Sequence, residues 1–272
     1  MLEDNHEDII AKAMRGKSIG KSMLADAIGV GKTDIEKVLS GEVLEDVIAR
    51  IGPHLNLDVE KLLIAANKHW SPRSVETIGV RKFESDFGEM SVNAYAVFDQ
   101  DSKKTLIFDT GTDCNSLISF IEEDGLKVDS ILLTHTHRDH IYCLEQLKSH
   151  FPGVDIFVHK SEQLVGTIPI EENFELRMGA IKLNALHTHG HSVGGLTYLI
   201  DGLPCPVAIV GDALFAGSMG GGMVSYADAL KTNREKIMTL PDNCVLCPGH
   251  GPMTTVGEEK KYNPFFPEFQ GN

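Results

Sequence analysis

The stretch Ser130-Ile131-Leu132-Leu133-Thr134-His135-Thr136-His137-Arg138-Asp139-His140 is the most informative part of this chain. An apolar run typical of a buried strand leads directly into three histidines and one aspartate. Side chains two residues apart point the same way on an extended chain, so His135 and His137 can converge on one ion. Asp139 and His140 follow where the chain must turn and can face a second position. Because borderline divalent metals prefer imidazole and carboxylate ligands, the stretch predicts a two-metal site.

Three later segments offer further ligands of the same kind, each after an apolar or alternating run. The cluster His187-Thr188-His189-Gly190-His191 follows Ala180–Leu183, Asp212 ends the run Val207–Gly211, and His250 follows Val245–Pro248. Loops at strand ends are where protein scaffolds commonly place catalytic groups. A single polar loop can carry surface histidines without any metal, but four such strand ends in one chain favour one shared metal centre.

In chain order, T-H-T-H-R-D-H, G-H-S, G-D-A-L-F and P-G-H-G-P resemble the motifs of the metallo-β-lactamase superfamily, especially its glyoxalase II-like (hydroxyacylglutathione hydrolase-like) branch. The similarity runs from about Val75 to Phe269. It implies an α+β fold, an αβ/βα sandwich in which two mixed sheets face each other, helices cover the outside and metals lie at one edge. It also implies two divalent metal ions. Zinc is favoured, and iron or manganese also suits these ligands.

The resemblance assigns a role to each metal-ligand candidate. The implied ligands are His135, His137 and His191 for the first ion, Asp139, His140 and His250 for the second, and Asp212 as the bridge. Asp139 is also the implied catalytic residue, since it would orient the attacking hydroxide. Asp109 is implied to have a structural role beside the metals. We interpret His187 and His189 as neighbours of the ligands or as solvated, because the family places the ligand directly after Gly190.

The implied activity is hydrolysis of a thioester or ester by a metal-bridging hydroxide, with a small molecule as the partner. A lactonase or an iron-dependent persulfide dioxygenase on the same fold is an alternative, and so is a metabolite-sensing transcriptional regulator. Tyr142 and Cys143, which stand where the branch has two glycines, are weak candidates for substrate contacts, as are Tyr226 and Lys260. Gly220-Gly221-Gly222 replaces a segment with a substrate-recognising arginine, which predicts a flexible, uncharged loop and weighs against glutathione thioesters.

The first 70 residues have a different pattern, in which apolar residues recur at helical spacing between glycine-containing stops. This predicts about five short helices, and Leu24 to Glu42 resembles a Cro/repressor-type helix-turn-helix. The region carries nine Lys or Arg against twelve Asp or Glu, and this net charge of −3 disfavours contact with phosphates. We therefore expect it to serve assembly, including a homo-oligomer, or to cover the active site. The expected units are an all-α helix-turn-helix-like domain (1–70), a linker (71–74) and a catalytic domain (75–272).

Composition narrows the class of protein further. No apolar run reaches the roughly 18 residues that span a bilayer, and the acidic N-terminal stretch lacks the features of a signal peptide. Five cysteines, an odd number scattered along the chain, predict a reducing, cytoplasmic location. A net charge of −14 argues against nucleic acid or an anionic membrane as a partner.

Overall fold

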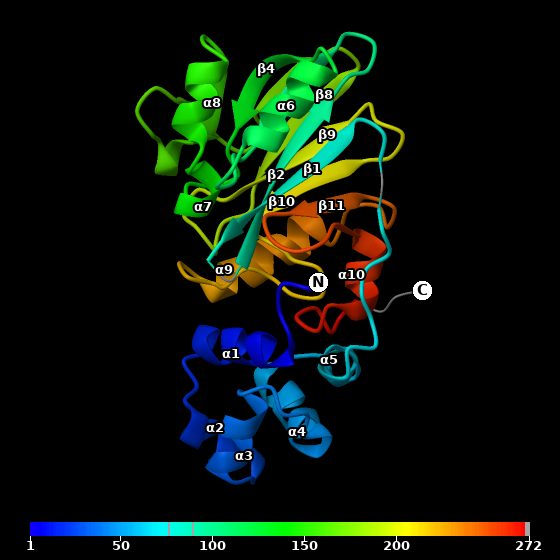
Figure 1. The fold of residues 1–272 in the computed structure, drawn as a ribbon. Helices are drawn as coiled ribbons and strands as arrows, with labels where there is room; N and C mark the ends of the chain where they lie inside the picture. Colours follow the sequence, from blue (N-terminus) through cyan, green and yellow to red (C-terminus); the bar gives the residue numbers. More distant parts are fainter. Residues whose placement is uncertain (76, 89, 270–272) are drawn as a thin grey trace.

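The structure is a computed structural model, and it describes residues 1–75, 77–88 and 90–269. The chain begins with short helices, as the sequence predicted, and continues into two β-sheets with helices on their outer sides (Figure 1). The N-terminal helices are α1 (His6–Gly16), α2 (Lys21–Ile28), α3 (Lys32–Val38), α4 (Glu45–Leu55) and α5 (Val59–Ala66). We call residues 1–70 the helical region. Among the described residues, no helix is long and apolar enough to cross a membrane.

Local sequence signals fix the ends of these helices. Asn5 precedes α1, and its backbone N–H donates to the Asp8 carboxylate at 3.0 Å in a capping box. Asp58 precedes α5 and is its N-cap, because its side chain accepts a hydrogen bond from the backbone N–H of Lys61. Gly29 ends α2 in the left-handed conformation that glycine adopts without strain.

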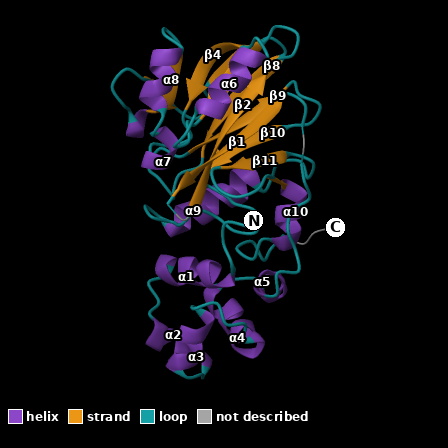
Figure 2. Cartoon of the chain, viewed as in Figure 1, coloured by secondary structure: helices purple, strands orange, loops and turns teal. Residues whose placement is uncertain are grey.

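Two six-stranded sheets form the layers of the sandwich (Figure 2). The first has the order β1 (Val80–Phe87), β2 (Met90–Phe98), β3 (Lys104–Phe108), β4 (Lys127–Leu132), β5 (Asp155–His159) and β6 (Ile168–Ile170). The second has the order β12 (Thr254–Thr255), β11 (Val245–Pro248), β10 (Val207–Gly211), β9 (Leu196–Asp201), β8 (Ile181–His187) and β7 (Glu175–Met178). The remaining α-helices are α6 (Asn115–Glu123), α7 (Arg138–Ile141), α8 (Leu144–His150), α9 (Tyr226–Thr232) and α10 (Val256–Tyr262).

Strand direction brings the ligand-bearing loops together. In the second sheet, β10 and β11 are parallel, and β8 has the same direction because both β8 and β10 are antiparallel to β9. The carboxyl ends of β8, β10 and β11 therefore lie at one edge of this sheet. The chain that follows β4 of the first sheet lies at the same edge, because its histidines and aspartate group with the residues that follow β8, β10 and β11.

Three hydrophobic clusters hold the layers. The inner cluster lies between the two sheets and includes Tyr95, Phe108 and Tyr198, all buried. The second lies between the first sheet and the helices α6 and α8, and it includes Leu117 and Ile121 of α6, both buried. The architecture is therefore the predicted αβ/βα sandwich.

The third cluster joins the helical region to the outer face of the second sheet. It contains residues of α1 to α5 together with β10, β11 and the C-terminal phenylalanines. Lys61 of α5 reinforces this contact, because its buried ammonium donates to the carbonyl oxygens of Lys260, Phe266 and Phe269 at 2.8, 3.1 and 2.7 Å. The helical region thus shares a continuous apolar interior with the sandwich.

Glu259 of α10 is a fully buried acid beneath the chain that follows β10. It accepts hydrogen bonds from Gly217 N, Thr254 Oγ1 and Asn263 Nδ2 at 3.0, 2.8 and 2.9 Å. Burial outweighs these donors and raises the pKa of its carboxyl from 4.5 to about 7. The folded state therefore favours the protonated form, so the stability from this group is complete below pH 4.5 and falls as pH rises through about 7.

Replacing Glu259 with Gln is expected to remove this pH dependence, because an amide does not ionise. Between pH 5 and pH 8 the wild type should lose about 2.5 kcal/mol of stability relative to Glu259→Gln, following about 1.4 kcal/mol per pKa unit. Thermal or denaturant unfolding of both chains in the presence of chelator measures the difference. Glu123→Gln, at the exposed end of α6, is the matched control. A Glu259→Gln difference that stays constant with pH would contradict the expectation.

Candidate metal centre

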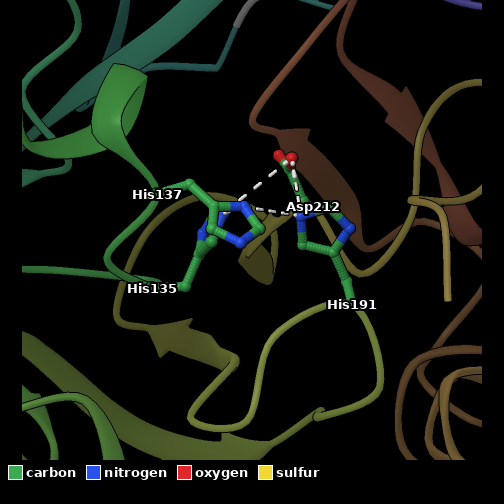
Figure 3. A group of neighbouring side chains, drawn as sticks. All are labelled: His135, His137, His191 and Asp212. Atoms are coloured by element: carbon green, nitrogen blue, oxygen red, sulfur yellow. Dashed lines mark hydrogen bonds and ion pairs between the residues drawn. The ribbon is translucent and has the colours of Figure 1, made fainter. Parts of the chain in front are cut away.

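Four side chains converge on one point at the edge between the sheets. His135 and His137 follow β4, His191 follows β8 and Asp212 follows β10. The Nε2 atoms of His135 and His191 lie 3.0 and 2.9 Å from Nδ1 of His137. Figure 3 shows the four side chains pointing toward one another. One ligand atom from each lies within 4.8 Å of the others, which suits coordination of a single cation.

Three further side chains form a second group beside the first. Asp139 and His140 lie on α7, and His250 follows β11. His250 Nε2 is 3.3 Å from Asp139 Oδ2 and 3.4 Å from Asp212 Oδ2. His140 Nε2 is 3.3 Å from Asp212 Oδ1. Asp212 therefore faces both groups, and the seven residues singled out in the sequence lie in these two adjacent groups.

The second ring nitrogen of four of these histidines is hydrogen-bonded away from the centre. The pairs are His135 Nδ1 with Thr134 Oγ1 (3.0 Å), His140 Nδ1 with Asp109 Oδ2 (2.8 Å), His191 Nδ1 with Gly221 O (2.9 Å) and His250 Nδ1 with Ser91 O (2.6 Å). Carbonyl and carboxylate oxygens only accept, so Nδ1 donates in the last three pairs. Nε2 then faces the centre. Partners of this kind fix the tautomer and direction of metal-binding imidazoles.

Asp109 connects the two segments that carry the ligands after β4. Its Oδ1 accepts from Thr134 N at 2.7 Å, and its Oδ2 accepts from Thr134 Oγ1 at 2.7 Å and from His140 Nδ1. The residue is buried and has a positive φ of 55°. These contacts match the supporting role that the resemblance implied for it.

Gly249 shows how tightly the centre is packed. A Cβ at this position would overlap Asp212 Oδ1 and lie 2.6 Å from Cε1 of His140. Any larger residue before His250 would therefore displace members of both groups. This close approach is the physical reason for glycine in the P-G-H sequence.

Burial and charge act differently on the pKa values of the ligands. Burial, with His140 nearby, lowers the pKa of His135, and burial also lowers that of His191, so both favour the neutral, metal-binding form. Burial opposes the charge of His140 and His250, but the neighbouring carboxylates together outweigh it, Asp212 with Asp109 at His140 and Asp212 with Asp139 at His250. They raise the two pKa values to about 10 and about 11. A cation that binds here must displace those protons.

The donor set fits a pair of divalent cations. His140 Nε2 and Asp212 Oδ1 are buried and, within the described parts of the chain, have no hydrogen-bond partner, although they lie 3.3 Å apart. Buried polar atoms normally find a partner, so these two point to a ligand between them. Nitrogen and oxygen donors without thiolate suit zinc, iron or manganese.

The weak candidates for substrate contacts lie in different surroundings. Tyr142 is exposed and, with Arg138, lines a cavity of about 650 Å³ next to α7. Cys143 is buried in the cluster beneath α6, where its proximity adds to the effect of burial in raising the pKa of Cys114 to about 12. Lys260 pairs with Asp242 at 2.6 Å. Of the four candidates for substrate contacts, Tyr142 is therefore the one that lines the cavity beside helix α7, which carries Asp139 and His140.

Tyr226 and the two extra histidines lie outside both groups of ligands. The Tyr226 ring packs against Gly16 of α1, and burial raises the pKa of its hydroxyl to about 12. The ring of His187 stacks on that of His189 at 4.4 Å and on that of His159 at 4.2 Å. Parallel stacked imidazoles do not aim their nitrogens at one point, in keeping with the interpretation that His187 and His189 are not ligands.

Sequence reasoning missed three contributors. Ser91 and Gly221 act through backbone carbonyl groups, which leave no side-chain signal in a sequence. Glu162 accepts from Thr136 N at 2.8 Å and from Gly194 N at 2.7 Å, and so ties together the loops that carry His137 and His191. An acid three residues after His159, at the end of an apolar strand-like run, was the available signal for Glu162.

Comparisons with known proteins agree with the geometry. The sequence profile of the metallo-beta-lactamase superfamily matches residues 87–250, more than half of the chain. The chain is 32% identical over 208 residues to a probable metallo-hydrolase, YqgX, of Bacillus subtilis, covering 67% of this chain and 95% of the relative. It is 30% identical to the hydroxyacylglutathione hydrolase GloC of Haemophilus influenzae, covering 71% of this chain and 97% of that one.

Among solved structures, TTHA1623 in a di-iron-bound form has a similar fold, with a TM-score of 0.56 and 25% identity. The match covers 67% of this chain and 99% of TTHA1623. The matches to YqgX, GloC and TTHA1623 cover 67%, 71% and 67% of this chain and so leave 33%, 29% and 33% uncovered. Each of these uncovered parts is longer than the helical region. On the profile match and the shared fold, this chain belongs to the metallo-beta-lactamase superfamily.

Proposed function

We propose that this protein is a metal-dependent hydrolase of a thioester or ester, with glyoxalase II-like chemistry. The observation that carries the proposal is the position of Asp212 between two sets of ligand atoms, within 3.4 Å of both His191 and His250. A relative with the printed name hydroxyacylglutathione hydrolase supports the reaction class. The assigned ligands of the first ion are His135, His137 and His191, those of the second are Asp139, His140 and His250, and Asp212 is shared.

When bound, two divalent cations acidify a water molecule and polarise the carbonyl group of a substrate. The residues of the chain supply orientation and proton handling. Burial would raise the pKa of the Asp139 carboxyl, but hydrogen bonding from His250 together with the charges of His140 and His250 holds it below its usual value. It therefore stays ionised at neutral pH and can accept a hydrogen bond from the attacking water. This assigns Asp139 as both ligand and catalytic residue.

The surroundings of the centre bear on the substrate. The arginine expected in the glyoxalase II-like branch is replaced by Gly220–Gly222, so this loop offers no positive side chain for the carboxylates of glutathione. Tyr142 and Arg138 line the cavity beside α7 together with Asp86 and Asp113. We infer that an uncharged acyl thioester or ester suits this surface better than a glutathione thioester.

An assay of purified, metal-loaded protein tests the proposal. We expect hydrolysis of simple acyl thioesters with a kcat/KM no lower than that for S-lactoylglutathione, since the missing charge-assisted contact, worth about 1.5 to 3 kcal/mol, removes the advantage that a glutathione group would otherwise have. A panel of acyl-homoserine lactones is run in parallel, and turnover confined to the lactones would support the lactonase alternative. Oxygen uptake with a persulfide would support the dioxygenase. No hydrolysis of any ester, thioester or lactone would contradict the proposal.

A further inference from the structure

The loop after β10 lies directly on the first group of ligands. We call residues 213–225 the glycine loop. Its Gly221 carbonyl accepts the hydrogen bond from His191 Nδ1 at 2.9 Å. A Cβ on Gly220 would overlap the carbonyl oxygen of Asp212 and lie 3.0 Å from His191 Nδ1. The position of this loop therefore sets the direction of His191 and the space around Asp212.

The helical region holds the same loop through a buried charge pair. Ser218 Oγ donates to Asp4 Oδ2 at 2.6 Å. Lys12 of α1 donates to the carbonyl oxygen of Met219 at 2.9 Å and also to the Asp4 carboxylate. The side chain of Lys12 is 12% exposed and that of Asp4 is 8% exposed. Two residues of the helical region thus contact the two residues that directly precede Gly220.

A third contact of Lys12 reaches the second group of ligands. Its ammonium lies 4.8 Å from the centroid of the Phe215 ring, in a cation–π arrangement. That ring in turn meets the ring of His250 edge to face, with centroids 5.6 Å apart. Lys12 therefore contacts the buried part of the glycine loop at two points, the Phe215 ring and the Met219 carbonyl oxygen.

The energetics of burial make this arrangement specific. Two charges removed from water are tolerated only when each is paired and its remaining hydrogen-bonding capacity is used. The Asp4 carboxylate accepts hydrogen bonds from Ser218 and Lys12. The Lys12 ammonium contacts that carboxylate, the Met219 carbonyl oxygen and the face of the Phe215 ring. Movement of Met219 or Ser218 away from α1 would leave this charge pair incompletely satisfied. The pair therefore favours one position of the loop.

We propose that Asp4 and Lys12 are positioning residues for the metal centre. They fix the glycine loop so that the Gly221 carbonyl aligns His191 toward the first ion. The helical region is then a structural part of the metal site, and by linkage a bound metal stabilises the docking of α1 in return. This inference rests on the proposed metal centre.

The test measures metal binding by the full-length chain rather than turnover. We compare the wild type, Lys12→Met, which keeps the apolar stem, and Lys17→Met, which removes the same charge from an exposed site at the end of α1. Competition with a chromogenic chelator gives the Kd of each ion. We expect Lys12→Met to raise the Kd of one of the two ions about tenfold, the scale seen when a hydrogen-bond partner of a metal ligand is removed. Lys17→Met should have the Kd values of the wild type.

Because Lys12→Met leaves the Asp4 carboxylate buried without its cation, the double variant Asp4→Asn/Lys12→Met tests the same contact with no unpaired buried charge. At saturating cobalt, its visible absorption spectrum should differ from that of Lys17→Met, which a change in stability alone would not produce. The inference is overturned if Lys12→Met and the double variant have the same cobalt spectrum as Lys17→Met and the same Kd for each of the two ions. A wild type that binds no divalent metal would instead contradict the proposed function.

Discussion

Replacing Asp212 with Asn is expected to abolish hydrolysis and to lower the number of bound ions below two. Asp212 lies at the end of β10, is 7% exposed, and places its two oxygens within 3.4 Å of His140, His191 and His250. Burial would raise the pKa of this carboxyl, but the charges of His140 and His250 hold it well below its usual value, so it is ionised at neutral pH. An amide of the same shape removes that charge from between the two cations.

The loss of kcat should be on the order of a thousandfold or more, the upper scale for removal of one preorganised electrostatic group. Turnover and metal content of the same preparation are measured together. Asp124→Asn, on the exposed end of α6, is the matched control and should behave as the wild type. An Asp212→Asn chain with two tightly bound ions and normal turnover would show that the shared-ligand assignment is wrong.

Removal of metal from the wild type is the second large effect that we expect. Chelation should eliminate turnover and lower the midpoint of thermal unfolding by about 10 °C. A ligand at roughly a thousand times its Kd contributes about 4 kcal/mol, and about 1 kcal/mol shifts Tm by 2 to 4 °C in a chain of this size class. Ligand atoms of both groups come from segments that follow four different strands, so bound ions join the two sheets.

Adding back zinc, iron or manganese separately should restore Tm and turnover, and the metal that restores both at the lowest free concentration identifies the preferred ion. The affinity should rise with pH, because His140 and His250, with pKa values raised to about 10 and about 11, must lose protons when a cation binds. Asp212→Asn serves as the control, with a much smaller stabilisation by metal. Full turnover of the chelated wild type would rule out metal-dependent hydrolysis.

The convergence of the candidate ligands was predictable because their sequence signals are local. His135, His137, Asp139 and His140 lie within six residues, and the other ligands each follow a recognisable apolar run. In the sandwich, strands that run in the same direction end at the same edge of a sheet, and this alignment brings the candidate ligands together. The short helices of the helical region were predictable for the same reason, since the helical spacing of apolar residues and the glycine-containing stops are properties of neighbouring residues.

Contacts between residues distant in sequence were not predictable in this way. The pairs Asp4 with Ser218 and Lys12 with Met219 are separated by more than 200 positions, and neither half carries a motif. The glycine loop illustrates the consequence. Its three glycines predicted flexibility, but Met219 and Gly220 are buried, and Gly220 is required by its contact with Asp212. Whether a glycine permits motion or close packing depends on neighbours that the local sequence does not reveal.

Trp70 gives this fold a built-in optical reporter. It is the sole tryptophan in the sequence, stacks on Tyr262 at 4.7 Å, and its Cζ3 atom lies 2.9 Å from the place where a Cβ on Gly217 would stand. Its emission therefore arises at the seam between the helical region and the sandwich, whereas circular dichroism averages over every helix and strand. Comparing the two signals during denaturation separates detachment of α1 to α5 from collapse of the sheets, without any label.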